Sequence, residues 1–572
     1  MSLMEQARLR LAGMEAPLLL AVLGLFCGLF AGIVIVIFRF YTDAVVLIWF
    51  QDLERVQDFE SLPWELRLVL PIIGGVVIGI VFHLLPNHLR SIGVRHVVER
   101  LAMHEGHLPM KNAIVQFFTG GFALTCGLPV GREGPAIHLG SAVSSMTGKQ
   151  LHLPNNSQRI LVGCGTAAAI AACFNTPLAG VIFALEVVML EYTIASFIPI
   201  ILAAVSSTVV ARIVFGNDVA YSVPALDMIS MWEIPAIVLL GLIGGVWSAG
   251  FITLTEKIAQ FTNNWPRWVR PSLAGILVGG LALVAPEIMG PGYDTVSQSF
   301  HGELAFSVLL LALLAKTVAT AFCGGLSVPG GAIGPSLFIG AALGGVFGYG
   351  LDAILPGDQS YVGFYAMLGL ATLMSATLYA PLAALMALLE LTGNPNIIMP
   401  GMLSVVLANL VVSHAFHKRS IIQTMLAARG VETRISPLMM LLRRISIGKL
   451  LDTSIVILDR KLTRVEAESI LKSEPRWLLI KENNWPSELM HAGELAAFLL
   501  ESEQNDIDLM EIPAKRENMV SVHLQATLAE ALESMNEKNV DAAYVYHRGG
   551  TDRIIGVVTR GKIEHYYTYR ST

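Results

Sequence analysis

The stretch "VGREGPAIHLG", residues 130–140, guides the interpretation of this chain, because it lies between two long apolar runs. Four of its residues are of kinds that a membrane interior normally excludes: Arg132, Glu133, Pro135 and His138. An ionisable side chain inside a membrane segment is expensive to bury, so it is a functional candidate by default. The stretch therefore predicts a polar site within an apolar protein.

The composition indicates a membrane protein with many spans. Of the 572 residues, 54% are hydrophobic and only 14% are charged, whereas soluble domains carry about 25% charged residues. The mean hydropathy is +0.63. The net charge of −6 comes without a basic stripe, which excludes nucleic acid as a partner. The five cysteines lie singly in apolar segments, so neither a disulfide framework nor a metal site is expected.

Charge density divides the chain into two predicted domains. Residues 1–440 alternate apolar runs with short polar breaks, whereas residues 445–572 have the composition of a soluble domain. Arg8 and Arg10 precede the first apolar run, and the segment between the domains is basic. Because positive charge concentrates on the cytoplasmic side of membrane proteins, both termini are expected in the cytoplasm.

An internal repeat runs through the membrane domain. "GPAIHLGSA" (134–142) resembles "GPSLFIGAA" (334–342), and "FNTPLAGVIFALEV" (174–187) resembles "LYAPLAALMALLEL" (378–391). These segments are short and interrupted by glycine or proline, which is typical of helices that stop inside the membrane. Duplicated halves of this kind place their binding site at the interface between them.

Two of the repeated segments begin with Gly-Pro, at Gly134-Pro135 and at Gly334-Pro335. Proline fits the first turn of a helix, and glycine lets the backbone approach a ligand closely. A helix N-terminus carries unpaired N–H groups and a partial positive charge. Two such ends, one from each half, predict an anion site made of backbone amides. Amides hold an anion without a full opposite charge, so the anion can leave again.

Glu133 stands directly before one of these helix starts, beside Arg132. An ionised carboxylate there would compete with the permeant anion for the amides, and a protonated one would release them. The alternative is a helix N-cap held by a salt bridge to Arg132. We favour a gate, because ionisable residues in membrane cores are usually functional.

The tail shows a second, weaker repeat. "LTRVEAESILKS" and "TLAEALESMNEK" predict amphipathic helices with Thr463 and Thr527 as N-caps. Each helix precedes a β-rich run, so the tail is expected to contain a helix–strand–turn–strand–helix unit twice. This predicts a small α+β pair.

Taken together, "GREGPAIHLG", "VPGGAIGPSLFIGAALG" and "YAPLAALMALLELTGN" resemble the CLC family of chloride channels and proton/chloride exchangers, of bacterial type. The tail resembles the paired CBS domains that many members carry. The resemblance implies an all-α polytopic membrane protein, an inverted repeat of tilted, broken helices with halves at about 20–215 and 230–430. It also implies a homodimer in the lipid bilayer of a bacterial inner membrane, with one pathway for chloride or another small anion in each subunit.

The resemblance assigns roles to residues of this chain. It makes Glu133 the gating glutamate. The residues it places around the anion are Arg132, Gly134, Ala332, Ile333, Gln423, Ile92 and Gly93. Ile92 stands where the family has an anion-coordinating serine, Ile333 replaces a phenylalanine, and Gln423 replaces a tyrosine. Since isoleucine has no hydroxyl, a preference for chloride over other anions is in doubt.

The proton pathway departs most from the family pattern. Exchangers usually carry a second, inward-facing glutamate, and Val187 occupies that position here, after Glu186. Valine cannot carry a proton. We therefore favour passive conduction gated by Glu133 and sensitive to voltage and pH, with proton-coupled anion exchange as the alternative. Glu186 is expected to be a structural hydrogen-bond partner rather than a proton relay.

Other function classes have less support. The repeat alone would permit a solute carrier of another family, but the GREGP motif argues against one. "HEGHLP", residues 104–109, is not the HExxH zinc pattern, so no enzyme is expected. The CBS pair could bind adenine nucleotide or brace a dimer. Lys562 stands where an aspartate would hold the ribose, three residues after Thr559, so we favour the brace and expect no cofactor.

Overall fold

The computed structural model describes residues 17–49, 59–217, 221, 223–224, 226, 228–354, 362–431, 437–482, 485–546 and 554–571. The chain forms two compact units. The membrane unit comprises the described residues of Pro17–Leu151 and Gln158–Thr433, and the tail unit comprises those of His152–Ser157 and Arg434–Thr572.

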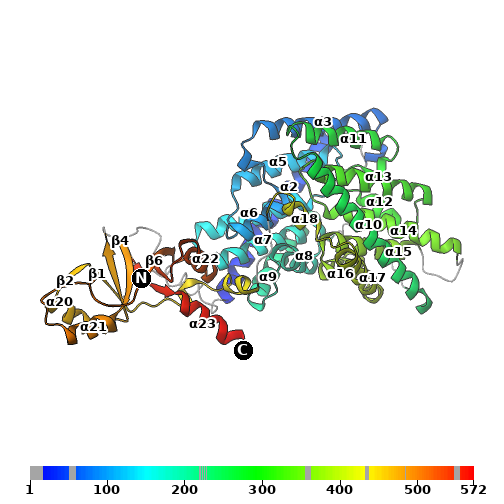
Figure 1. Ribbon diagram of the computed structural model, residues 1–572. Helices are drawn as coiled ribbons and strands as arrows, with labels where there is room; N and C mark the ends of the chain where they lie inside the picture. Colours follow the sequence, from blue (N-terminus) through cyan, green and yellow to red (C-terminus); the bar gives the residue numbers. More distant parts are fainter. Residues whose placement is uncertain are drawn as a thin grey trace. The chain divides into compact units, whose positions relative to one another are not determined.

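The first half of the membrane unit is a series of helices (Figure 1). They are α2 (Pro17–Trp49), α3 (Trp64–Leu84), α4 (Gly93–Met103), α5 (Met110–Thr125), α6 (Glu133–Gln150), α7 (Asn155–Phe174), α8 (Pro177–Phe183), the π-helical turn η3 (Ala184–Met189) and α9 (Ile194–Phe215). The short helix α8 begins with a proline, as the broken apolar segment there predicts.

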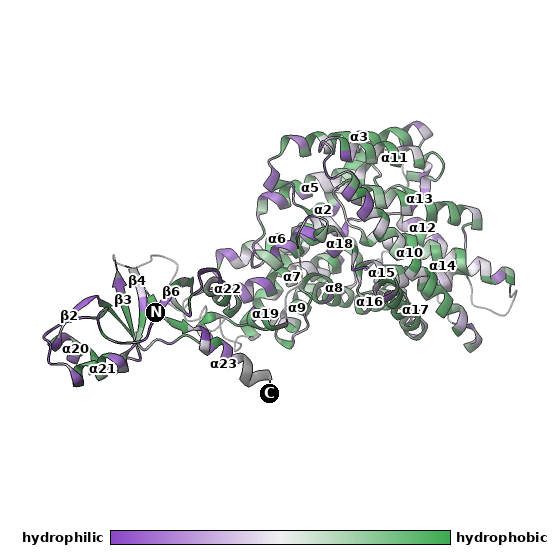
Figure 2. Ribbon diagram, in the orientation of Figure 1, coloured by the Kyte–Doolittle hydropathy of each residue, from purple (hydrophilic) through white to green (hydrophobic). Residues whose placement is uncertain are grey.

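The second half follows the same order. Its helices are α10 (Ile234–Phe261), α11 (Val269–Ala282), α12 (Tyr293–His301), α13 (Phe306–Gly325), α14 (Ile333–Ile354), α15 (Val362–Leu378), α16 (Pro381–Thr392), α17 (Ile398–Leu410), the π-helical turn η7 (Val411–Ala415) and α18 (Ile421–Ala427). Among the described residues, eight helices are long and apolar enough to cross a membrane. Figure 2 shows apolar residues along most of these helices.

The two halves repeat one helix crossing at matching positions. A Cβ added to Gly140 of α6 would lie 2.4 Å from the carbonyl oxygen of Gly165 in α7. A Cβ added to Gly340 of α14 would lie 2.4 Å from the carbonyl oxygen of Gly369 in α15. Only glycine allows backbones to approach this closely. The shared crossing supports the predicted duplication.

The tail unit is built on a six-stranded sheet in the order β1-β3-β4-β6-β7-β8. The strands are β1 (Ile455–Asp459), β3 (Trp477–Glu482), β4 (Trp485–His491), β6 (Arg516–His523), β7 (Ala542–Tyr546) and β8 (Ile554–Thr559). In each half of the sheet a parallel pair is followed by an antiparallel hairpin: β1 with β3 and then β4, and β6 with β7 and then β8. The strands β2 (Lys461–Thr463) and β5 (Asp506–Asp508) pair separately.

The tail helices are α19 (Pro437–Leu442), α20 (Arg464–Leu471), α21 (Ala492–Glu501), α22 (Leu528–Lys538) and α23 (Arg560–Ser571). Both predicted N-caps are confirmed: Thr463 and Thr527 each accept the backbone N–H of a glutamate three residues later. In both, the glutamate side chain bonds back to the cap residue's N–H, which completes a capping box.

Candidate functional site

The two Gly-rich motifs of the membrane unit meet through their backbones. Gly131 and Gly331 form an antiparallel bridge in which each N–H donates to the other's carbonyl oxygen, both at 2.8 Å. A Cβ on Gly134 would lie 2.5 Å from the amide nitrogen of Gly331, so glycine is required at this contact. Since α6 and α14 begin within two residues of the bridge, the predicted convergence of the two helix starts is confirmed.

Glu133 extends from the first half to the helix start of the second half. Its side chain is fully buried. Oε2 accepts the amide of Gly334 in the first turn of α14, at 3.3 Å, and Oε1 accepts the hydroxyl of Tyr293, at 2.7 Å. Glu133 is not the N-cap of its own helix, because Arg132 occupies that position. The carboxylate thus lies where the exposed N–H groups of a helix N-terminus attract an anion.

Arg132 lies behind the tyrosine that holds Glu133. Its guanidinium is 4.7 Å from the centroid of the Tyr293 ring, and its Nη2 donates to the carbonyl oxygen of Cys173, at 3.2 Å. A guanidinium over an aromatic face is attracted by the ring's negative charge. Tyr293 is therefore held on one side by a cation and donates on the other to a carboxylate.

Tyr293 and the lysine that supports it are the parts of this site that sequence reasoning did not single out. Lys316, in α13, is fully buried, and its Nζ donates to the carbonyl oxygens of Ile288, at 2.8 Å, and Gly290, at 2.7 Å. These carbonyls belong to the loop that leads into α12, whose first residue is Tyr293. The available signals were a lone lysine in an apolar run and the Gly-Pro-Gly turn before Tyr293.

A cavity of about 370 Å³ lies beside the start of α14. Its lining includes four residues of the predicted anion-binding set: Ile92, Gly93, Ala332 and Ile333. Arg132, Glu133 and Gly134 are not among the described residues that line it, although Gly331 of the backbone bridge is. The structure therefore places Ile92, Gly93, Ala332 and Ile333 at the cavity, whereas Arg132 and Gly134 lie beside the backbone bridge.

Gln423 does not face this cavity. The residues of α18 that line it are Ile421, Ile422 and Met425, while the backbone N–H of Gln423 donates to the hydroxyl of Ser420, at 3.2 Å. The neighbours of Gln423 face the cavity instead, because a shift of one residue rotates a helical side chain by about 100°.

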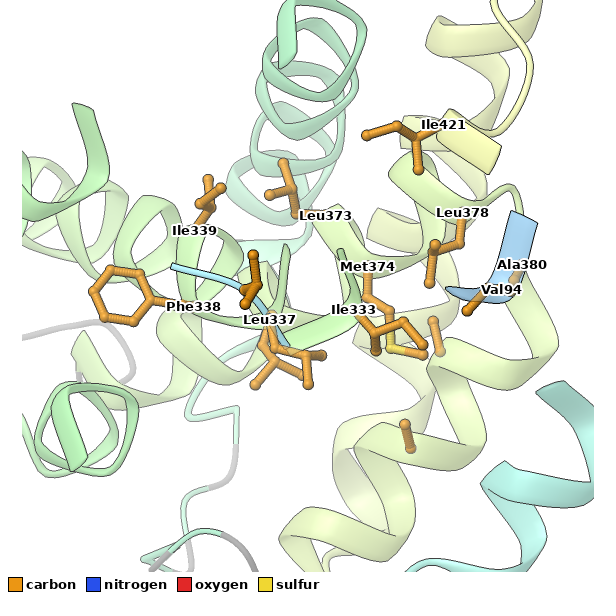
Figure 3. Close-up of a cluster of buried hydrophobic side chains, with 14 of the residues drawn as sticks. Val94, Ile333, Leu337, Phe338, Ile339, Leu373, Met374, Leu378, Ala380 and Ile421 are labelled. Carbon is orange, nitrogen blue, oxygen red and sulfur yellow. The ribbon is translucent and has the colours of Figure 1, made fainter. Parts of the chain in front are cut away.

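The walls of the cavity near α14 are apolar. Val94, Ile333, Leu378 and Ile421 all line it, and Figure 3 shows them among the buried hydrophobic side chains of this region. Side chains of this kind offer no hydrogen bond to an anion. At these four positions a donor can come only from the backbone, while the lining beside Gly93 adds the side-chain amide of Gln116, which has no hydrogen-bond partner among the described residues.

Glu186 has the structural hydrogen bonds that the sequence predicts. Its two carboxylate oxygens accept two backbone amides at the start of α16, at 3.2 and 2.7 Å. Glu390, its counterpart in the second half, accepts two amides at the start of α8, at 2.9 and 2.7 Å. The halves therefore cap each other's helices reciprocally. Val187 is buried among hydrophobic residues, so nothing there can take a proton.

Two buried histidines lie between α4 and α6. Nδ1 of His96 and Nε2 of His138 are 3.0 Å apart, within hydrogen-bond distance. Both side chains are buried, and Nδ1 of His138 has no hydrogen-bond partner among the described residues. Helix α4 packs against both α6 and η3, the turn that carries Glu186. The pair therefore places two imidazole rings in contact inside the membrane unit, next to the turn that carries Glu186.

In the tail, Lys562 has an acidic partner within the protein. Its Nζ is 3.5 Å from Asp452, which also pairs with Arg476 at 3.3 Å. Burial raises the pKa of Asp452, but the Ser454 amide and the neighbouring cations offset this and leave that pKa below its usual range. Lys562 occupies the position where a ribose-binding aspartate is expected, and there it forms an ion pair with Asp452.

Fold and site together define a membrane transport protein of known type. The pattern of the voltage gated chloride channel family matches residues 73–413, and that of the CBS domain matches residues 509–568. The chain belongs to the CLC family of chloride channels and transporters, with a C-terminal CBS region. The predicted family and fold class are confirmed, and membership makes this an anion-transport protein rather than an enzyme.

Relatives differ in how they are named. A putative chloride channel protein, ClcB-like, of Ralstonia nicotianae is 31% identical over 67% of this chain and 90% of the relative. The H(+)/Cl(-) exchange transporter ClcA of Vibrio cholerae is 32% identical over 50% of this chain and 63% of the relative.

Solved structures share the fold. The structure of a slow cyanobacterial Cl-/H+ antiporter superposes with a TM-score of 0.64 at 24% identity, covering 72% of this chain and 97% of that one. The structure of a eukaryotic CLC transporter superposes with a TM-score of 0.60 at 20% identity, covering 98% of this chain and 99% of that one.

Proposed function

We propose that this protein exchanges protons for chloride or a similar small anion, with Glu133 as the gate that carries the proton. The observation that supports this most is the bond from the Gly334 amide to the Glu133 carboxylate. An ionised carboxylate competes with a permeant anion for this N–H. Protonation of Glu133 removes its charge, so the carboxyl group competes less well with the anion for the Gly334 N–H. Proton binding to Glu133 is therefore coupled to anion binding at this amide.

The relatives favour exchange over the passive conduction that the sequence predicts. Several at 31–32% identity are named H(+)/Cl(-) exchange transporters. Passive conduction is the second candidate, because Val187 provides no inner proton acceptor and the Ralstonia relative is named a putative channel.

Exchange requires a second proton-carrying group, and we assign that role to the pair of His96 and His138. His138 lies five residues after Glu133 in α6, which is about 7.5 Å along the helix axis. Nδ1 of His138 has no hydrogen-bond partner among the described residues, so this ring nitrogen is open to accept a proton. Glu186 is a weaker candidate, because both of its oxygens are bonded to backbone amides.

The test is flux through the purified full-length protein in liposomes. With an anion gradient and no initial pH gradient, exchange predicts that the anion gradient drives protons across the membrane and builds a pH gradient. Passive conduction predicts a reversal potential set by the anion gradient alone. His138→Gln is expected to reduce proton movement more than anion flux, whereas Glu390→Gln, in a capping position, is expected to leave their ratio unchanged.

The remaining assignments are also proposals. The backbone amides around Gly93, Ala332 and Ile333 bind the anion, the protein is a homodimer, and both termini lie in the cytoplasm.

The tail braces the dimer and does not bind adenine nucleotide. The ion pair between Lys562 and Asp452 supports this, because it occupies the position expected to bind the ribose. Removing the residues after about 445 should weaken the dimer, measured as mass in detergent by light scattering, while anion flux persists.

A further inference from the structure

Five arginines line the cavity beside α14: Arg90, Arg95, Arg267, Arg270 and Arg429. They come from four separate parts of the chain: the loop before α4, α4 itself, the region where α11 begins, and the residues after α18. No aspartate or glutamate is among the described residues of the lining. Their arrangement concentrates positive charge far beyond what a single monovalent anion can neutralise.

The five charges act on one another. Arg429 repels Arg95 and Arg270, and Arg267 repels Arg90. Within the described ranges, none of the five forms an ion pair with a carboxylate. Glu99 attracts Arg429 but does not line the cavity. The cluster is thus held together by the fold and lacks a counter-charge in its own cavity.

Several of the guanidinium donors are unused. Arg90 donates to Asn87 Oδ1, at 2.6 Å, and to a backbone carbonyl, and Arg270 donates to the carbonyl of Asn263. Nε of Arg90, Nη1 of Arg95 and Nε of Arg270 are buried without a hydrogen-bond partner. Buried polar groups in native proteins are nearly always bonded, so these arginines carry donors that the described residues do not satisfy.

We propose that this cavity binds a multivalent phosphate-class anion, and that the bound anion obstructs access to the pathway. Guanidinium groups match phosphate oxygens in charge and in the geometry of paired hydrogen bonds. The volume of about 370 Å³ lies in the range of small-molecule sites, about 300–1,000 Å³. Obstruction rests on the proposed function, since it requires the transported anion to pass through the cavity. Binding of the phosphate-class anion does not depend on the proposed function.

Binding is tested by calorimetry on the full-length protein in a neutral detergent, with inorganic pyrophosphate as the probe and chloride as the comparison. We expect saturable pyrophosphate binding that weakens with salt. Arg95→Gln and Arg270→Gln should each weaken it about tenfold, because each removes a charge-assisted hydrogen bond. Arg419→Gln, which removes an exposed arginine outside the cavity, is the matched control and should leave affinity unchanged.

The site would be overturned by the absence of saturable pyrophosphate binding, or by equal affinity in the parent and both arginine variants. Loss of binding only in Lys562→Gln would place the ligand in the tail, and would also overturn it. The source of the phosphate is distinguished in lipid nanodiscs. Displacement of pyrophosphate by cardiolipin, which carries two phosphates, but not by phosphatidylcholine, identifies a lipid headgroup, and its absence identifies a soluble phosphate.

Obstruction is tested separately in liposomes with pyrophosphate present on both sides. Anion flux should fall in the parent and much less in Arg95→Gln. If pyrophosphate binds but flux is unchanged, the site stands and obstruction is wrong. If the parent shows no anion flux without pyrophosphate, the proposed function fails while the calorimetric result still decides the site.

Discussion

The two halves of the membrane unit share their helix order and helix crossings but differ in charge at the bridge. Where the first half has Arg132 and Glu133, the second half has Ala332 and Ile333, each 200 positions later. The first half therefore supplies a carboxylate, and the second half supplies the Gly334 amide that binds it. The two halves can form a gate because only the first half carries a carboxylate, Glu133, at this position.

Elsewhere the halves agree. Glu186 and Glu390 occupy matching positions and make matching bonds to the amides of α16 and α8. We infer that residues shared by both halves support the fold, whereas residues present in one half perform transport. Substitutions in both halves test this distinction.

The largest effect is expected from Glu133→Gln. Glutamine has the shape of glutamate but cannot carry a proton, so it resembles a permanently neutral gate. Anion flux should persist, lose most of its pH dependence and no longer move protons. The measurement is anion and proton flux in liposomes across a series of pH values.

A Glu133→Gln variant with the parent's pH dependence would place the gate on another residue. The asymmetry between the halves would then be unrelated to transport, and the His96–His138 pair would become the first residues to test.

Glu186→Gln and Glu390→Gln should behave alike. Each removes a charged acceptor from two backbone amides, which should lower the free energy of unfolding by about 1–3 kcal/mol. The ratio of protons to anions should be unchanged in both. Thermal unfolding in detergent and flux in liposomes measure these two quantities. Loss of proton movement in Glu186→Gln alone would show that this glutamate has taken over the role missing at Val187.

Tyr293→Phe should have a smaller effect. It removes the hydroxyl that donates to Glu133 and keeps the ring under Arg132. The ionised gate is then held less firmly, so flux at neutral pH should rise roughly fivefold, the equivalent of one hydrogen bond of about 1 kcal/mol. The measurement is the initial rate of chloride efflux. A rate equal to the parent's would mean that the Gly334 amide alone holds the gate.

The sequence predicts the parts of this structure that have local signals. Gly-Pro pairs and interrupted apolar runs predict where α6, α8 and α14 begin, and capping residues predict two tail helices. The contact between Tyr293 and Glu133 joins residues 160 positions apart, and no local pattern specifies such a pair. The arginine cluster likewise assembles from four separate segments.

The misplacement of Gln423 has a different cause. Helix α18 has only seven residues, so its sequence contains too few turns to show which face is apolar and which side chain is turned inward. Ile421, Ile422 and Gln423 are consecutive, and only tertiary packing decides which of them faces the cavity.

The smallest effect is expected from Ile92→Ser, which tests whether the apolar wall of the cavity limits selectivity. Ile92 lines the cavity directly before Gly93, whose φ of +77° suits glycine. A serine there adds one neutral donor, which should raise chloride flux relative to nitrate flux by about two- to threefold, the equivalent of about 0.5 kcal/mol. Ile422→Ser, on α18, is the control, because it adds the same hydroxyl from another helix. An equal shift in both variants would reflect polarity alone. No shift in Ile92→Ser would mean that its side chain does not reach the anion, so that the choice among anions depends on the amides at the start of α4 and α14.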